Sequence, residues 1–191
     1  TIAAKASDKV YNANTLADVT LSTSDMVAGD TLTLNKTAAN FDTKNVGVGK
    51  TVTVEGLSLG GTDAGNYAIS NANAKATTTA NITQAALSVS GITAANKTYD
   101  ASTNAMVSTA NAKLNGLFEG DKLVVSATGS FADKNAGTKK TVNLTSTYAG
   151  ADVGNYAITD QATTTADIAK LNGVVVTADK QSKTVGSVDP K

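Results

Sequence analysis

The pentapeptide GNYAI occupies residues 65–69 and returns unchanged at residues 154–158, which is 89 positions further along the chain. In each copy, a Gly and an Asn, both of which favour turns, precede a Tyr and an Ile that are two residues apart. Side chains two residues apart lie on the same face of a β-strand. Each copy therefore predicts a turn followed by a strand, and the recurrence indicates that one building block is made twice.

The repetition extends over most of the chain. Shifting the sequence on itself by 86 to 91 residues aligns five blocks in the same order. The aligned pairs are KVYN (9–12) with KTYD (97–100), AGDTLTL (28–34) with EGDKLVV (119–125), FDTKNVGVGKTVTV (41–54) with FADKNAGTKKTVNL (131–144), DAGNYAI (63–69) with DVGNYAI (152–158), and ATTTANI (76–82) with ATTTADI (162–168). Internal repetition of this kind predicts an array of similar modules.

Composition and alternation predict that these modules are built from strands. The chain has 30 Thr and 17 Asn against a single Pro, a profile that favours pleated surfaces joined by turns. The segment TVTVEGLSL (51–59) alternates apolar and polar residues, then changes phase at Gly56, where we expect a bulge or a tight turn. Short strands at a spacing of about 8 to 12 residues are typical of a β-sandwich.

We therefore expect an all-β protein made of two tandem Ig-like antiparallel β-sandwich modules, each with its own interior. The predicted modules are residues 1–84 and 85–171, and residues 172–191 are predicted to begin a third, opened by GVVVTAD (173–179). The boundary near Gln84–Leu87 contains no Gly, Ser or Pro linker between the two units. A short connection restricts relative motion, so we expect a semi-rigid, elongated rod.

The residue types that the chain lacks exclude several classes of function. It contains no His, Cys or Trp, and all 16 basic residues are Lys, so the commonest general base, the thiol nucleophile and the planar guanidinium fork are absent. We expect that the chain is not an enzyme. The 16 Lys balance the 16 acidic residues, which argues against nucleic acid as a partner, and no apolar run is long enough for membrane insertion.

Three segments carry a resemblance to a known family. NKTYDAST (96–103), FADKNAGTKKTV (131–142) and GADVGNYAI (150–158) resemble the YDG repeats of large secreted bacterial adhesins of the filamentous haemagglutinin-like kind, although Ala101 stands where the family's name has Gly. The segment 174–190 looks like the opening of a related MBG repeat. The resemblance implies an extracellular location, secreted or at the bacterial cell surface, and a role in cell adhesion or the biofilm matrix.

The aromatic residues provide the first candidate sites. Six of the eight fall at equivalent places in the two units, and equivalent placement is what a shared scaffold requires. These six are Tyr11 with Tyr99, Phe41 with Phe131, and Tyr67 with Tyr156. Phe118 and Tyr148 have no counterpart, and Tyr148 is the better candidate for stacking on a sugar.

Acidic and amide side chains in equivalent turns provide the second. Asp63 with Asn66, and Asp152 with Asn155, flank a Gly in each unit, and calcium prefers such oxygen ligands. Asp and Asn in turns usually bond to their own backbone, and no known calcium-loop spacing is present. We expect turn chemistry and no cofactor, with calcium as the alternative.

The resemblance, together with the repetition, implies structural stalk or spacer repeats that project a binding region away from the cell. The expected partners are neighbouring repeats of the same polypeptide. The alternative is a repeat that itself binds a matrix polysaccharide, or another copy of the adhesin in a fibre.

Overall fold

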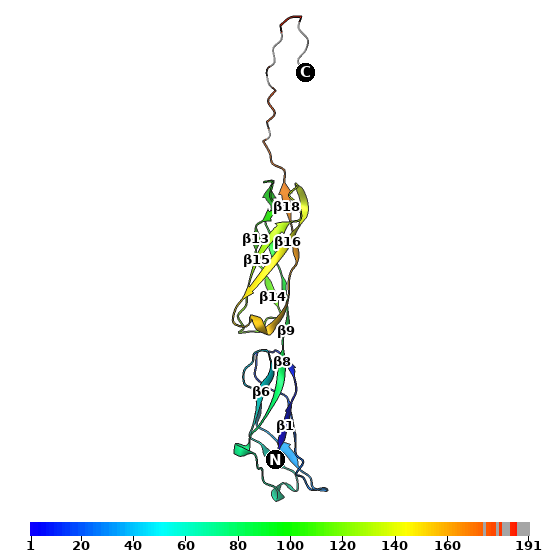
Figure 1. The fold of residues 1–191 in the computed structure, drawn as a ribbon, viewed down its shortest axis with the longest axis vertical. Coiled ribbons are helices and arrows are strands. Elements are labelled where there is room, and N and C mark those ends of the chain that lie inside the picture. The colour runs from blue at the N-terminus through cyan, green and yellow to red at the C-terminus, as the bar shows by residue number, and fades with distance from the viewer. Residues whose placement is uncertain (174, 179, 181–183, 187–191) are drawn as a thin grey trace.

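The computed structural model describes residues 1–173, 175–178, 180 and 184–186, and shows two β-modules stacked end to end in an elongated molecule (Figure 1). Apart from three short 3-10 turns, every regular element in these residues is a strand. The predicted all-β fold is confirmed. None of the helical turns in this described part has the length and apolarity needed to cross a bilayer.

The first repeat contains eight strands in three sheets, ordered β1-β3, β2-β8-β6-β5 and β4-β7. The elements are β1 (Ala3–Ala6), β2 (Lys9–Val10), β3 (Val19–Ser22), β4 (Thr33–Asn35), β5 (Ala38–Phe41), β6 (Gly47–Glu55), β7 (Ser58–Gly60), η1 (Ala64–Asn66), η2 (Ala72–Ala74) and β8 (Ala76–Thr83). The predicted phase change falls between β6 and β7, at Gly56. This glycine has φ +62°, and a Cβ there would lie 2.2 Å from the Thr37 hydroxyl oxygen, so the turn requires Gly.

The second repeat has ten strands, also in three sheets, ordered β10-β13, β11-β18-β16-β15-β12 and β14-β9-β17. The elements are β9 (Ala85–Ser90), β10 (Thr93–Ala94), β11 (Lys97–Thr98), β12 (Asn104–Ala105), β13 (Val107–Ser108), β14 (Lys113–Asn115), β15 (Val124–Phe131), β16 (Gly137–Ala149), η3 (Val153–Asn155), β17 (Tyr156–Thr159) and β18 (Thr163–Ala169).

Most strand pairs are antiparallel, as expected, but three pairs are parallel. In each repeat an early two-residue strand runs beside the last strand, as β2 does with β8 and β11 with β18. In the second repeat, β17 also runs parallel to β9. These pairs join the two ends of a repeat, so its first strands depend on its last ones for hydrogen bonds.

The connection between the repeats is a single residue. Strand β8 ends at Thr83 and β9 begins at Ala85, and the intervening Gln84 donates its side-chain amide to the carbonyls of Gly154 and Tyr156, at 3.2 and 3.1 Å. Gln84 is therefore held by the second repeat, which leaves little freedom for bending at this point.

The sequence led us to expect one interior per repeat. This prediction is wrong, because the buried apolar residues do not divide in that way. One cluster fills the first repeat and continues into the near half of the second, through Tyr11 and Tyr156. A smaller cluster, containing Phe131, Val142, Ala166 and Ile168, fills the far half of the second repeat. The continuity arises because aromatic rings from both repeats meet at the junction and close the space between the two sandwiches.

Half of the predicted third repeat lies outside the described residues. The structure describes residues 172–173, 175–178, 180 and 184–186 of this segment, and none of these belongs to a strand. The start of an MBG-like repeat at 172–191 therefore stays a prediction.

Candidate functional site

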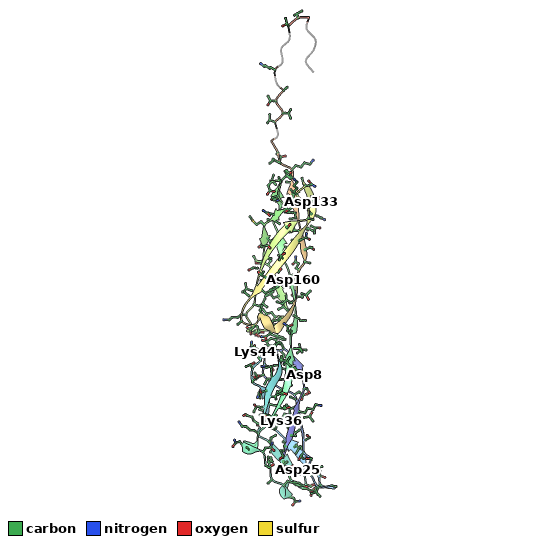
Figure 2. All side chains as sticks on the ribbon, in the orientation of Figure 1. Asp8, Asp25, Lys36, Lys44, Asp133 and Asp160 are labelled. Carbon is green, nitrogen blue, oxygen red and sulfur yellow. The ribbon has the colours of Figure 1, made fainter. Side chains whose placement is uncertain are left out.

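A polar network joins the two repeats at their junction, and Figure 2 places Lys44 at this boundary. Among the described residues there is no group of three or more acidic, His or Cys side chains suited to a metal ion. We describe the junction as the candidate functional site because it brings charged and aromatic side chains of both repeats together.

Asp121 is the centre of the junction. Its side chain is 1% exposed, and its two oxygens accept hydrogen bonds from both repeats. From the first repeat, the Tyr11 hydroxyl donates at 2.7 Å and Lys44 Nζ donates at 2.5 Å. From the second repeat, the Tyr156 hydroxyl donates at 2.6 Å. Lys44 also pairs with Asp152 at 3.1 Å, so one cation bridges two carboxylates across the boundary.

These contacts fix the charge state of the network. Burial acts to raise the pKa of Asp121, but the hydrogen bonds from Lys44, Tyr156 and Tyr11 outweigh it and leave the pKa below its ordinary value. Burial, with the hydrogen bond to Asp121 second, raises the pKa of Tyr156 to about 12. At neutral pH the site therefore holds a carboxylate, an ammonium and two neutral phenols, each in the form that its hydrogen bonds need.

Three aromatic rings close the apolar side of the junction. The rings of Tyr11 and Tyr156 meet edge to face, with centroids 5.5 Å apart and an interplanar angle of 75°. Phe118 packs on both, with centroids 5.9 Å from Tyr11 and 6.3 Å from Tyr156. Edge-to-face pairs of this kind stabilise by about 0.5–1.5 kcal/mol beyond the area that they bury.

Asn155 makes a second polar contact across the boundary. It is 4% exposed, its side-chain oxygen accepts from the backbone N–H of Val46 at 3.0 Å, and its amide donates to the Asn45 side chain at 3.2 Å. A buried amide without partners would be costly, so these bonds tie the loop of the first repeat to the second.

The four calcium candidates lie in two different environments. Asp63 and Asp152 each accept a backbone N–H within their own repeat, from Thr31 at 2.8 Å and Lys122 at 2.9 Å, and these donors lie 32 and 30 residues earlier in the chain. Neither Asp side chain caps its own 3-10 turn. Asp152 and Asn155 also belong to the junction, whereas Asn66 is exposed.

Tyr148, the candidate for sugar stacking, is half-buried. Its ring packs against the main apolar cluster and its hydroxyl donates to Asp160. Burial, with this hydrogen bond second, raises the pKa of Tyr148 to about 12. The ring is part of the module wall rather than an exposed platform.

Of the six paired aromatics, Tyr11, Phe41, Phe131 and Tyr156 are buried, while Tyr67 and Tyr99 are half-buried. Sequence reasoning missed that Tyr11 reaches across the boundary, and it missed that Asp121 and Lys44 meet there. The available signal was the repeated Gly-Asp pair of each unit, Asp30 and Asp121, which stands in a block that also recurs.

Comparison with protein families matches the chain in two segments. The model of the YDG domain matches residues 1–79 and, a second time, residues 83–166. The chain belongs to the YDG domain family. Neither the curated proteins nor the solved structures contain a match to it. The junction described above is thus the contact between two consecutive YDG repeats.

Proposed function

We propose that the two YDG repeats are part of the stalk of a secreted or cell-surface bacterial adhesin, where they hold a binding region away from the cell. In this role the chain is not an enzyme, its partners are neighbouring repeats of the same polypeptide, and it works outside the cell. The observation that supports the proposal is the bridge from Lys44 to Asp121 and Asp152, which joins consecutive repeats across a one-residue connection.

A stalk needs its repeats to resist bending, and the junction contains two kinds of restraint. The buried ion pair and the two tyrosine hydroxyls restrain the orientation of one repeat relative to the other, because hydrogen bonds to a charged group are short and directional. The aromatic rings supply apolar contact, which is lost if the repeats tilt apart. Together they favour one relative orientation of the two repeats.

The proposal predicts that Lys44→Met loosens the junction without unfolding either repeat. The chain has no native Cys, so Ser58→Cys and Thr145→Cys, both at exposed strand positions, place one spin label in each repeat. Pulsed electron resonance should give a narrow distance distribution for the parent chain, and one at least twice as wide for Lys44→Met.

The matched control is Lys75→Met, which removes an exposed ion pair to Glu55 inside the first repeat. It should leave the distribution narrow, because exposed pairs within one module do not orient the other. An equally narrow distribution for Lys44→Met, with circular dichroism unchanged, would show that the bridge does not orient the repeats.

A further inference from the structure

The two copies of GNYAI end in different structures. In the second repeat, Tyr156–Thr159 is strand β17, which pairs in parallel with β9 so that Tyr156 lies opposite Ala85 and Ile158 opposite Leu87. In the first repeat, residues 67–70 belong to no strand. The same sequence therefore forms a strand only where a neighbouring strand receives its backbone hydrogen bonds.

Strand β9 fills the middle of a sheet in the second repeat. It lies between β14 and β17, and its side chains alternate, with Ala85, Leu87 and Val89 buried and those between them exposed or partly exposed. Leu87 is 1% exposed and Val89 is 6% exposed, so this strand supplies two large side chains to the interior.

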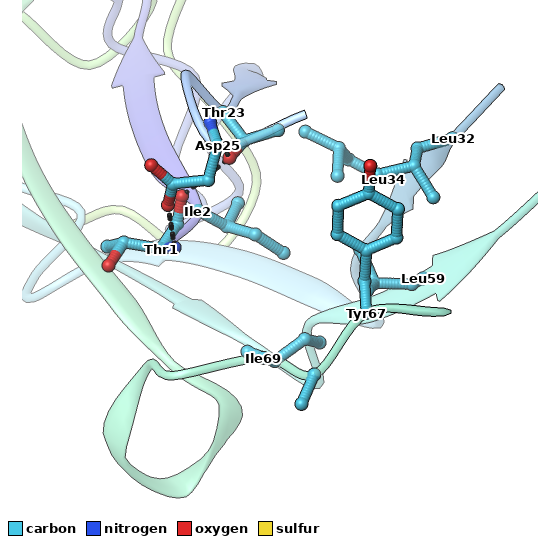
Figure 3. A pocket seen from close by; sticks show the side chains of 10 residues that line it. Thr1, Ile2, Thr23, Asp25, Leu32, Leu34, Leu59, Tyr67 and Ile69 are labelled. Atoms are coloured by element: carbon cyan, nitrogen blue, oxygen red, sulfur yellow. Dashed lines mark hydrogen bonds and ion pairs between the residues drawn. The ribbon is translucent and has the colours of Figure 1, made fainter. Parts of the chain in front are cut away.

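A groove in the first repeat occupies the equivalent position (Figure 3). In the close-up, Leu32, Leu34, Leu59 and Tyr67 face Thr1, Ile2 and Asp25 across an open space. The remaining lining residues are Thr23, Ala68 and Ile69. Ile2, Leu32, Leu34, Leu59 and Ile69 give the groove an apolar part, and the YAI segment 67–69, which belongs to no strand, also lines it.

A side-chain amide fixes the correspondence between the repeats. Gln161 bonds both backbone groups of Ile92, at 2.9 and 2.8 Å, and Asn71 bonds both backbone groups of Ile2, at 2.8 and 2.9 Å. Ile2 therefore corresponds to Ile92, which follows β9 by two residues. The counterpart of β9 would reach the groove immediately before Ile2.

The burial of the lining residues agrees with this correspondence. Leu123 and Val125 are buried, at 8% and 9% exposed, whereas their counterparts Leu32 and Leu34 are only half-buried. Tyr156 is likewise buried and its counterpart Tyr67 is half-buried. The first repeat thus presents apolar surface of the kind that β9 helps to cover in the second.

The same end of the first repeat also carries half of the junction network. Tyr67 donates its hydroxyl to Asp30 at 2.6 Å and accepts the backbone N–H of Val27 at 2.9 Å. Tyr156 makes the corresponding bonds with Asp121 and Phe118, at 2.6 and 3.0 Å. In the second repeat, the Asp121 and Tyr156 pair contacts Tyr11 and Lys44 of the first repeat. The first repeat has the corresponding pair, Asp30 and Tyr67, at its end away from the junction.

We propose that this groove is a strand-acceptor site, and that its occupant is the extended segment leading out of the last strand of a preceding YDG repeat. The segment would run parallel to residues 67–69, as β9 runs to β17, with two alternate apolar side chains in the groove. The carboxylate of Asp30 would then accept hydrogen bonds from the Tyr and the Lys of that preceding repeat that correspond to Tyr11 and Lys44. This inference rests on the stalk proposal only for the choice of occupant.

The test adds the missing strand to the whole chain. The segment TQAALSVSG, copied from residues 83–91, is fused ahead of Ile2 so that its last Gly replaces Thr1. Hydrogen exchange is then measured at the amides of residues 67–70, and the alternate amides that point toward the added strand should become at least tenfold slower. Unchanged exchange at these amides would overturn the proposal.

A control fusion separates strand insertion from simple lengthening of the chain. It carries Asn in place of the Leu and the Val that correspond to Leu87 and Val89, and it should leave the exchange unchanged. Equal protection by both fusions would contradict the apolar groove. Concentration-dependent dimers of the unfused chain that dissociate when the strand is fused would identify a second copy as the occupant, and would overturn the choice of a preceding repeat.

This test is independent of the one for the stalk. The spin-label distances report the contact between the first and second repeats, whereas the exchange rates report the opposite end of the first repeat. Failure at the groove with a narrow distance distribution would leave the stalk proposal in place and remove the acceptor site alone.

Discussion

The YDG motif has Gly as its third residue, and in this chain both repeats have Ala at that position, Ala13 and Ala101. Ala13 and Ala101 both have positive φ, at 61° and 63°, which is the left-handed region that disfavours a Cβ. Each follows the Tyr-Asn or Tyr-Asp pair of its repeat, in a loop that Lys9 or Lys97 closes by bonding to several oxygens. The loop keeps its conformation in both repeats because the lysine, which precedes the alanine, binds two backbone carbonyls that follow it.

Replacing Ala101 by Gly should stabilise the second repeat. A left-handed conformation costs a residue with a Cβ about 1–2 kcal/mol, and the greater freedom of Gly in the unfolded chain offsets about 0.5–1 kcal/mol of the gain. We expect the free energy of unfolding to rise by about 0.5–1 kcal/mol, measured by urea denaturation. As a control, Ala157→Gly, at an exposed position in β17 without positive φ, should lower the free energy of unfolding by a similar amount. A lower free energy of unfolding in both variants would show that residue 101 is unstrained.

At the scale of elements, the strands could be predicted and their partners could not. Alternation in TVTVEGLSL and the Gly56 break correctly located β6 and β7, because local patterning determines which face is buried. The pairing of β9 with β17 joins residues about 70 positions apart, and it decides whether GNYAI continues into a strand. Asp121 and Tyr11 are 110 positions apart, so nothing local in either segment indicates their contact.

The junction should loosen in acid. Because the folded-state pKa of Asp121 lies below its unfolded value of about 4, its contribution to stability is complete above that value and disappears as the pH falls through the lower, folded one. Urea denaturation between pH 7 and pH 2 should show a loss of stability that is smaller in Asp121→Asn. If stability falls equally with pH in the parent chain and in Asp121→Asn, the loss arises from other carboxylates, several of which also have lowered pKa values.

At the scale of the whole molecule, residues of the types that form the junction recur at the two outer ends of the pair of repeats. The far end of the second repeat carries Tyr99, Lys134 and Asn135, the counterparts of Tyr11, Lys44 and Asn45. The end of the first repeat that lies away from the junction contains Asp30 and Tyr67, the counterparts of Asp121 and Tyr156. The two ends of the pair are therefore complementary, and each added repeat would extend the rod by the same contact.

Small-angle X-ray scattering of the intact chain in solution tests the central claim, that the junction holds two repeats in line, most directly. A single globule of 191 residues would have a radius of gyration of about 16 Å, and two stacked repeats should exceed 20 Å. The account predicts the larger value, together with a decrease in Asp121→Asn as the repeats bend toward each other. A value near 16 Å for the parent chain would contradict it.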